Sequence, residues 1–390
     1  MADTIKKLTI EGFKSIRKLE DFPLRALNVL IGANGAGKSN FVGFFRLLRE
    51  IVEQRLQVAL ATTEGGADAC LYLGPKVTRE FAAKLYFGEK SYQFSLLPTP
   101  DNRFVFGEET AIFYRNGRPD LIPSLGSGHS EANLKEWKGE HRGIPRGGLY
   151  HVYNSISSWV VYHFHDTSLS ASVRRPRALN DNEVFRPNAE NLAPFLFRIQ
   201  QSHPTSYSRI RDVVRLAAPF FDDFNLRPIP GTPDMIQLEW RQRGSDYPFR
   251  AHQLSDGTLR FVCLATALLQ PTPPPTGIFD EPELGLHPYA LTLLGNLFNQ
   301  VAEPSGGQIL KQVIISTQSA LLLNEFAPED VIVVERTSGE STFRRVDSKR
   351  LSEWLEEYTL GELWQKNVLG GRPQEDRNPD TVAGGGYLHS

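Results

Sequence analysis

Apolar residues along the chain follow first the period of a strand and then the period of a helix. Residues 6–13 and 26–31 are strand-like, and the second stretch is almost wholly apolar, which is typical of a buried strand. After a glycine-rich stretch, apolar residues recur at helical spacing from Ser39 to about Leu60. The first part of the chain therefore predicts a strand, a glycine-rich loop and a helix.

The middle of the chain carries shorter periodic stretches. Residues 84–97 and 103–114 read as strands joined by a turn that contains Pro, Asp and Asn, which predicts an antiparallel extension. Residues 117–149 have no clear period, and we interpret them as a loop or mobile insert. Residues 191–216 have helical periodicity that is interrupted near Pro204, so we expect a helical insert here.

Short apolar strands return in the last third, at residues 276–280 and 311–317, with an apolar helix at 259–269 before them. There is no internal repeat and no heptad run, so we expect no long coiled coil. Residues 371–390 are rich in Gly, Pro and polar side chains and are predicted to form a flexible tail. Together the elements predict an α/β fold: a mixed or parallel sheet core flanked by helices, an antiparallel β lobe and a helical insert.

Composition narrows the class of protein. Of the 390 residues, 40% are hydrophobic and 23% are charged, as expected of a globular chain, and the net charge of -2 argues against a protein that coats nucleic acid. Cys70 and Cys263 have no partner pattern, which indicates a reducing compartment. The N-terminus lacks a signal peptide's apolar stretch, and no run is long enough for a membrane helix. We therefore expect a cytoplasmic protein without a membrane partner.

The glycine-rich stretch has the form G-x-x-x-x-G-K-[ST] and begins at Gly32. Glycines let backbone N–H groups converge on phosphate oxygens, Lys38 supplies positive charge to the β- and γ-phosphates, and Ser39 offers a hydroxyl ligand to Mg²⁺. The dipole of the following helix favours the same anion. The predicted nucleotide-binding residues of this P-loop are Asn34, Gly35, Ala36, Gly37, Lys38, Ser39 and Asn40.

A second carboxylate for the metal is offered by the short strand at residues 276–280, which ends in Asp280 and is followed at once by Glu281. An Asp at the carboxyl end of a buried strand can hold Mg²⁺. The adjacent Glu281 is then placed to accept a proton from an attacking water, as a general base. By itself the pair could be an acidic turn; beside Lys38 it predicts a MgATP site with Ser39 and Asp280 as metal ligands.

A third motif, Leu254-Ser-Asp-Gly-Thr258, opens the apolar helix before that strand. Alone it would be an ordinary helix N-cap. With the P-loop and the Asp-Glu pair, its order and spacing resemble ABC-type ATPases. In that family the segment binds the γ-phosphate of a nucleotide held by the opposite subunit. The resemblance therefore implies that Ser255, Asp256 and Gly257 complete an ATP site in a head-to-head homodimer.

Two further segments extend the resemblance. Residues 283–288 resemble the segment that crosses the dimer interface in the family, and His165-Asp166 stands where a connecting loop could fall. Gln318 follows the strand at 311–317, where the family usually has a switch histidine. A glutamine can hydrogen-bond a phosphate or water, so Gln318 is a candidate catalytic residue. Because a glutamine cannot carry a charge, we expect slow or partner-dependent hydrolysis.

The branch of the superfamily is indicated by Asn40, by residues 13–16 (FKSI) and by the LSDGT form of the third motif, which look like the RecF/SMC/OLD-type ATPases. This resemblance implies a compact ABC ATPase head with a globular insert. We accordingly predict four parts: an N-terminal lobe with the P-loop (1–165), an insert (166–253), a C-terminal lobe with signature, Walker B and switch (254–370), and the tail (371–390).

More narrowly, several segments resemble stand-alone AAA-family ATPases of bacterial abortive-infection and anti-phage operons: VYHFHDTS, APFFDDF, DEPELGLHP, ISTQS and YTLGELWQKNVLGGRP. The resemblance implies an ATPase that controls a separate effector, such as a TOPRIM-like nuclease or another toxin. Two alternatives stay open. One is a DNA-repair or DNA-end-binding ATPase, and the other is an ATP-dependent scaffold with slow hydrolysis.

Two groups of residues outside these motifs admit two interpretations each. His163 and His165 alternate on a strand-like piece and could bind a metal, but the absence of a third ligand nearby favours a structural role. The basic residues Arg174, Arg175 and Arg177 could contact a phosphate backbone, although a solvated loop is the simpler expectation.

Overall fold

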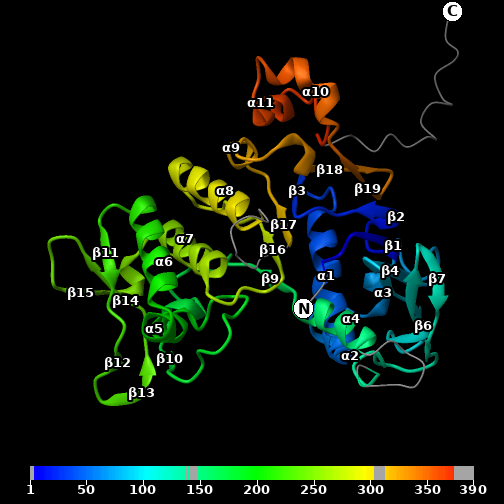
Figure 1. Cartoon of the computed structure of the whole chain (residues 1–390), viewed down its shortest axis with the longest axis horizontal. Helices are drawn as coiled ribbons and strands as arrows, with labels where there is room; N and C mark the ends of the chain where they lie inside the picture. The colour runs from blue at the N-terminus through cyan, green and yellow to red at the C-terminus, as the bar shows by residue number, and fades with distance from the viewer. Residues whose placement is uncertain (1–3, 138, 140–146, 303–311, 373–390) are drawn as a thin grey trace, which may run out of the picture.

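The computed structural model describes residues 4–137, 139, 147–302 and 312–372, and a six-stranded sheet lies at its centre (Figure 1). The strand order is β19-β18-β3-β17-β16-β9, and all neighbours are parallel except β18 and β19. The strands are β3 (Leu27–Ile31), β9 (Val160–Tyr162), β16 (Thr276–Asp280), β17 (Gln312–Ser316), β18 (Val331–Thr337) and β19 (Glu340–Arg345). The predicted mixed sheet core is therefore confirmed.

Both faces of this sheet are covered by hydrophobic cores. Successive side chains of a strand point to opposite faces and so enter different cores. In β3, Leu27, Val29 and Ile31 join one hydrophobic core, whereas Leu30 joins a second core on the other face. Burial on two sides explains why this strand reads as a continuous apolar run and not as an alternating one.

The second core is covered by an antiparallel sheet of order β2-β1-β4-β5-β6-β7, with β8 paired to β6. The strands are β1 (Lys7–Phe13), β2 (Ile16–Pro23), β4 (Phe81–Phe87), β5 (Lys90–Pro98), β6 (Phe104–Arg115), β7 (Arg118–Leu121) and β8 (Ser124–Gly126). The antiparallel lobe is thus confirmed, but residues 84–97 are not one strand. A turn at Gly88, which has φ +63°, divides them into a hairpin.

Helix α1 (Lys38–Val52) lies between this lobe and the central sheet and contributes Phe41, Phe44 and Phe45 to their shared core (Figure 1). It is shorter than predicted, because Gln54 adopts φ +60° and ends the regular helix. The chain continues through α2 (Leu56–Ala59), a π-helical turn (Leu60–Glu64) and α3 (Ala67–Cys70), and α4 (Gly148–Ser157) packs on α1. The predicted loop at 117–149 thus includes β7 and β8, whereas residues 138 and 140–146 lie outside the described part.

The other core is covered by helices and by an insert lobe at the left of Figure 1. The helices are α5 (Leu192–Ser202), α6 (Pro204–Ala217), α7 (Asp256–Leu269), α8 (Pro288–Ala302), α9 (Ala320–Leu323), α10 (Ser348–Leu355) and α11 (Leu360–Gln365). Two small sheets complete the insert: β10 (Arg177–Ala178), β13 (Thr232–Ile236) and β12 (Pro228–Ile229), and β11 (Phe221–Phe224), β14 (Glu239–Gln242) and β15 (Pro248–Arg250). The break predicted near Pro204 separates α5 from α6.

Within the described residues, no helix exceeds 15 residues, and none is long and apolar enough to cross a membrane. Cys70 and Cys263 are buried and not bonded to each other, and burial raises the pKa of each thiol to about 12.

Candidate nucleotide site

The predicted P-loop connects β3 to α1, with its glycines in close contact with the neighbouring strands. Gly37 has φ +113°, and a Cβ there would overlap the Ser341 hydroxyl on β19. A Cβ on Gly32 would overlap the carbonyl oxygen of Val334 on β18. The loop can therefore follow this path only with glycine at both positions.

Lys38 is buried, and its ammonium donates hydrogen bonds to the carbonyls of Gly32 (2.7 Å) and Ala33 (3.1 Å). Burial lowers the pKa of Lys38, and the nearby carboxylates of Glu281, Glu283 and Asp280 oppose that effect. Because β17 alone separates β3 from β16, the parallel sheet brings the P-loop lysine and the predicted acidic pair to one edge.

Three side chains hold the P-loop in place through hydrogen bonds. The Asn40 amide donates to Ser15 Oγ (2.6 Å), Ser341 Oγ lies 2.7 Å from Ser15 Oγ, and the Ser341 hydroxyl donates to the carbonyl of Ala36 (2.6 Å). Asn40 therefore ties the loop to the FKSI segment, and its predicted contact with nucleotide stays a prediction. Sequence reasoning missed Ser341, because nothing in the sequence indicates that β19 reaches the loop.

The P-loop also contacts the chain beyond α11. The Ala33 N–H donates to the Gly371 carbonyl (2.9 Å), and the Gly371 N–H donates to the Glu335 carboxylate (2.8 Å). The segment predicted to be a tail thus begins against the nucleotide loop, and its residues 373–390 lie outside the described part.

At the end of β16, Asp280 and Glu281 are held by the strand beside them. The Ser316 hydroxyl donates to the Asp280 carboxylate, and the Glu281 N–H donates to the Ser316 carbonyl (2.9 Å). His165 Nε2 lies 2.9 Å from the Asp280 carbonyl oxygen, so the segment proposed as a connecting loop does reach this strand. Glu281 has φ +44°, which is uncommon for a residue with a side chain.

Gln318 lies between two carboxylates. Its amide donates to the Glu281 carboxylate, and its backbone N–H donates to Glu283 Oε1 (2.7 Å). Burial raises the pKa of Glu283, and the hydrogen bond from Gln318 opposes that effect. The structure thus brings together the two predicted catalytic residues, Glu281 and Gln318.

The third motif, Leu254–Thr258, is here called the signature and lies at the start of α7. Ser255 is the N-cap, and its hydroxyl accepts a hydrogen bond from the Thr258 N–H (3.1 Å). A Cβ on Gly257 would overlap the Gly285 carbonyl oxygen, so the helix can pack against residues 283–286 only with glycine there. In the described part of the chain, the Ser255 hydroxyl bonds only to Thr258 and not to the P-loop.

The residues at this edge fit MgATP. A buried ammonium and a glycine cradle suit polyphosphate, and Mg²⁺ commonly takes one or two protein oxygens beside phosphate oxygens and water. Asp280 and Ser39, which is exposed in the first turn of α1, are the oxygens available for it. No cluster of three or more His, Cys, Asp or Glu side chains suited to a metal occurs in the described ranges, so a separate metal site at His163 and His165 gains no support.

Among the basic residues at 174–177, Arg175 is exposed as expected of a solvated loop, whereas Arg174 and Arg177 are paired with carboxylates. The Arg174 side chain is only 4% exposed and is paired with Asp256 at 2.7 Å, whereas Arg177 pairs with Glu190 at 2.6 Å. Burial of Arg174 also argues against a contact with a nucleic-acid backbone. Arg260 in α7 is also buried, and sequence reasoning did not identify it. Its position inside an otherwise apolar helix is the signal that could have indicated a buried, hydrogen-bonded arginine.

Two solved structures resemble most of the chain. One is the Smc head bound to the C-winged helix domain of ScpA, with TM-score 0.55 and 15% identity, covering 90% of this chain and 99% of that chain. The other is the Smc head domain with an extended coiled coil bound to the C-terminal domain of ScpA derived from Pyrococcus furiosus, with TM-score 0.52, 15% identity and coverage of 90% and 98%. The fold is that of an ABC-type ATPase head of the SMC and RecF-like branch.

The sequence profile of one family matches residues 27–324, and that family is described as "AAA domain, putative AbiEii toxin, Type IV TA system". Because the match spans well over half of the chain, the protein belongs to this family. A search of the curated proteins finds no match. The family and the fold together define a P-loop NTPase domain.

Proposed function

We propose that the protein binds and hydrolyses ATP in the presence of Mg²⁺. The observation that carries this proposal is the position of Lys38, whose buried ammonium is attracted electrostatically by the carboxylates of Glu281, Glu283 and Asp280. Its present partners are carbonyls of its own loop. A polyphosphate would offer that ammonium full negative charges, and such charge-assisted bonds are about twice as strong as neutral ones.

Each residue at the edge has a role in this proposal. Lys38 and the loop N–H groups bind the phosphates, Ser39 and Asp280 hold the metal, and Glu281 accepts the proton of the attacking water. Mg²⁺, when bound, would neutralise charge on the phosphates. Ser316 orients the Asp280 carboxylate through its hydrogen bond.

The site would be completed by a second copy of the chain. Ser255, Asp256 and Gly257 stand at a helix start where N–H groups face an anion favourably, and the Ser255 bonds stay within its own helix. A partner's phosphates could therefore meet this surface. The result is a homodimer with two ATP molecules between the heads, joined by ATP and separated by hydrolysis.

Glu281→Gln tests the proposed base and the dimer together. The variant keeps the hydrogen bond with Gln318 but cannot accept a proton, so hydrolysis should fall about 100-fold or more. ATP should then hold the dimer, which multi-angle light scattering would detect. Lys38→Ala is the matched control, since it should lose both ATP binding and the dimer. Normal hydrolysis by Glu281→Gln would refute the role of Glu281.

A second candidate function, an ATP-dependent scaffold with slow hydrolysis, is supported by the contact between Gln318 and Glu281. The hydrogen bond from Gln318 occupies the Glu281 carboxylate, which would otherwise be open to the attacking water. Gln318→Ala removes that bond. Faster hydrolysis by this variant would support a restrained base and the scaffold, whereas slower hydrolysis would show that Gln318 contributes to turnover.

In the cell, we propose that the ATPase is the sensor of an anti-phage system and controls a separate effector, such as a TOPRIM-like nuclease or toxin. Support comes from the family description, which names a type IV toxin–antitoxin system. The test is affinity purification of the tagged chain from its host. A second protein that co-purifies with the wild type but not with Lys38→Ala supports this role, whereas a partner unaffected by Lys38→Ala contradicts ATP-dependent control.

A further inference from the structure

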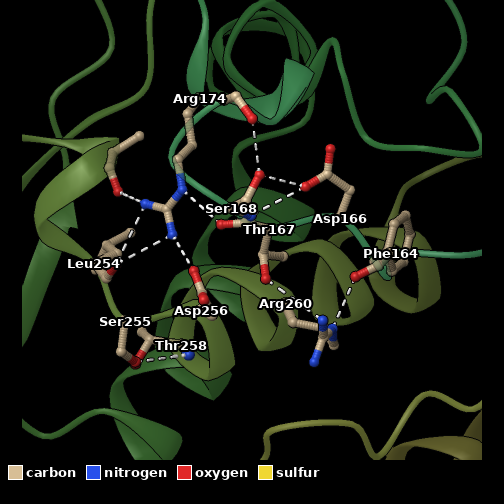
Figure 2. A network of polar contacts seen from close by, with 12 residues as sticks. Phe164, Asp166, Thr167, Ser168, Arg174, Leu254, Ser255, Asp256, Thr258 and Arg260 are labelled. Carbon is tan, nitrogen blue, oxygen red and sulfur yellow. Dashed lines mark hydrogen bonds and ion pairs between the residues drawn. The ribbon is translucent and has the colours of Figure 1, made fainter.

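Arg174 and Arg260 are two buried arginines that join three separate segments of the chain (Figure 2). Arg174 ends a short 3-10 turn (Ser172–Arg174) in the insert, and Arg260 lies in the second turn of α7. Between them runs the segment of residues 164–168, here termed the connector. The ATPase roles proposed above use neither arginine.

Arg174 binds both the connector and the signature. Its Nε donates to the Thr167 carbonyl (2.8 Å), and its Nη atoms donate to the carbonyls of Ala251 and Leu254, the latter at 3.3 Å. Its Nη2 also donates to Asp256 Oδ1 at 2.7 Å. Figure 2 shows the guanidinium between Leu254 and Asp256 on one side and the connector on the other.

The connector is also attached to the edge that carries the acidic pair. His165 Nε2 lies 2.9 Å from the Asp280 carbonyl oxygen. Arg260 donates to the carbonyls of Phe164 (2.8 Å) and His165 (3.0 Å), and also to the carbonyl of Leu284. A continuous set of hydrogen bonds therefore runs from Asp280, through the connector and Arg174, to Asp256.

We propose that Arg174 is a positioning residue that holds residues 254–256 in the orientation needed to bind the partner subunit's ATP, and that it links this orientation to the Asp280 end of its own subunit. The proposal rests on the ATP-sandwich dimer proposed above. Each subunit would then present residues 254–256 in one fixed orientation to the ATP held by its partner.

The chemistry of the side chain favours this role over simple packing. An arginine offers five N–H donors in a planar fork, and Arg174 directs them at three carbonyls and one carboxylate from two segments. Asp256 is 63% exposed, so little else holds its side chain. Without Arg174 the start of α7 keeps its N-cap at Ser255 but loses the bonds that Arg174 donates to Leu254 and Asp256, and the helix stays joined to the connector through Arg260 in its second turn.

The experiment mixes two variants, each defective in a different half of the composite site. Arg174→Ala should bind a fluorescent ATP analogue within about twofold of wild type, since the hydrogen bonds of Arg174 go to residues 167, 251, 254 and 256 and not to the P-loop, but should lose about tenfold or more of its ATPase activity and its ATP-dependent dimer. An equal mixture with Lys38→Ala should recover up to about a quarter of wild-type activity. Half of random dimers are mixed, and each has one intact site.

Control variants distinguish a failure of the role proposed for Arg174 from a failure of the ATP-sandwich dimer on which it rests. Lys38→Ala mixed with Ser255→Arg must also recover activity, because these variants damage opposite halves of the sandwich; if they do not, the sandwich dimer itself is wrong. Arg175→Ala changes the exposed neighbour of Arg174 and should match wild type. If Arg174→Ala unfolds in a thermal melt, Arg174→Lys is used, which should show the same pattern with a smaller loss.

Two outcomes would overturn the role of Arg174. One is wild-type activity and dimerisation of Arg174→Ala or Arg174→Lys. The other is a folded Arg174 variant that binds ATP but gives no recovery with Lys38→Ala while the Ser255→Arg control pair does recover. Recovery cannot come from a misfolded subunit, so a purely structural role would fail to produce it.

Discussion

Glu281 adopts the left-handed backbone conformation, with φ +44°, at the position where the proposed general base is needed. A residue with a Cβ pays about 1–2 kcal/mol for this conformation, and glycine does not. The strain persists because neighbouring contacts hold the backbone: the Glu281 N–H donates to the Ser316 carbonyl at 2.9 Å. Replacing Glu281 by Ala and by Gly separates this backbone cost from the loss of the carboxylate.

Both variants lose the hydrogen bond from Gln318, so their difference reports the backbone alone. Glycine gains about 1–2 kcal/mol from relief of the left-handed strain and loses about 0.4–1 kcal/mol because its unfolded chain is more flexible. We therefore expect Glu281→Gly to be more stable than Glu281→Ala by up to about 1.6 kcal/mol, with a central value of about 0.8 kcal/mol, although both should lose hydrolysis.

Urea unfolding followed by circular dichroism measures the difference as a shift in midpoint at constant slope, and a phosphate-release assay measures turnover. An Ala variant as stable as the Gly variant, or more so, would show that the backbone at this position is not strained. Substantial hydrolysis by either variant would contradict the proposed role of the carboxylate and would leave the strain without a functional reason.

Three further predictions concern the neighbourhood of the P-loop. Gly37→Ala should lose ATP binding and cost about 2–4 kcal/mol of stability, because its Cβ would overlap the Ser341 hydroxyl and its backbone is left-handed. In a thermal melt, Gly35→Ala should unfold at a clearly higher temperature than Gly37→Ala, because a Cβ on Gly35 meets open space. Ser15→Ala should cost about 1–3 kcal/mol in urea unfolding, because the Asn40 amide loses its acceptor, and a wild-type midpoint would contradict that support. Burial raises the pKa of Glu283 in the folded state above its pKa in the unfolded chain, so the folded state binds the proton more tightly. The contribution of this residue to stability is therefore present at low pH and is lost as pH rises from the unfolded pKa through the folded pKa. Glu283→Gln should therefore gain stability relative to wild type between pH 4 and pH 7 in parallel unfolding curves, and a constant difference would show that the carboxyl is not perturbed.

Much of this fold follows from local pattern. The strand at 276–280, the apolar strand and helix around the P-loop, and the break near Pro204 depend on side-chain period and on proline geometry, which act over a few residues. The errors have local causes too. The hairpin at Gly88 was missed because both of its strands continue the same alternation, and the regular helix α1 ends where Gln54 takes a left-handed conformation.

Contacts between distant segments were beyond such reasoning. Ser341 meets Ser15 and Ala36 because β19 pairs with β18 beside the P-loop strand. Arg174 stands among charged residues in the sequence and suggests a surface loop. Only the packing of the insert against the start of α7 buries it beside Leu254.

The amino-acid sequence alone was enough to predict the glycine-rich loop at Lys38 and the acidic pair at Asp280, since each motif is recognised from a few consecutive residues after an apolar strand. The tertiary structure decided which residues surround them. A parallel sheet brings strand ends together in an order that no local rule fixes, and that order places Gln318 against Glu281. Arg260 donates a hydrogen bond to Phe164, which lies 96 positions away in the sequence. Such a bond forms only once the sheet and its helices have packed together.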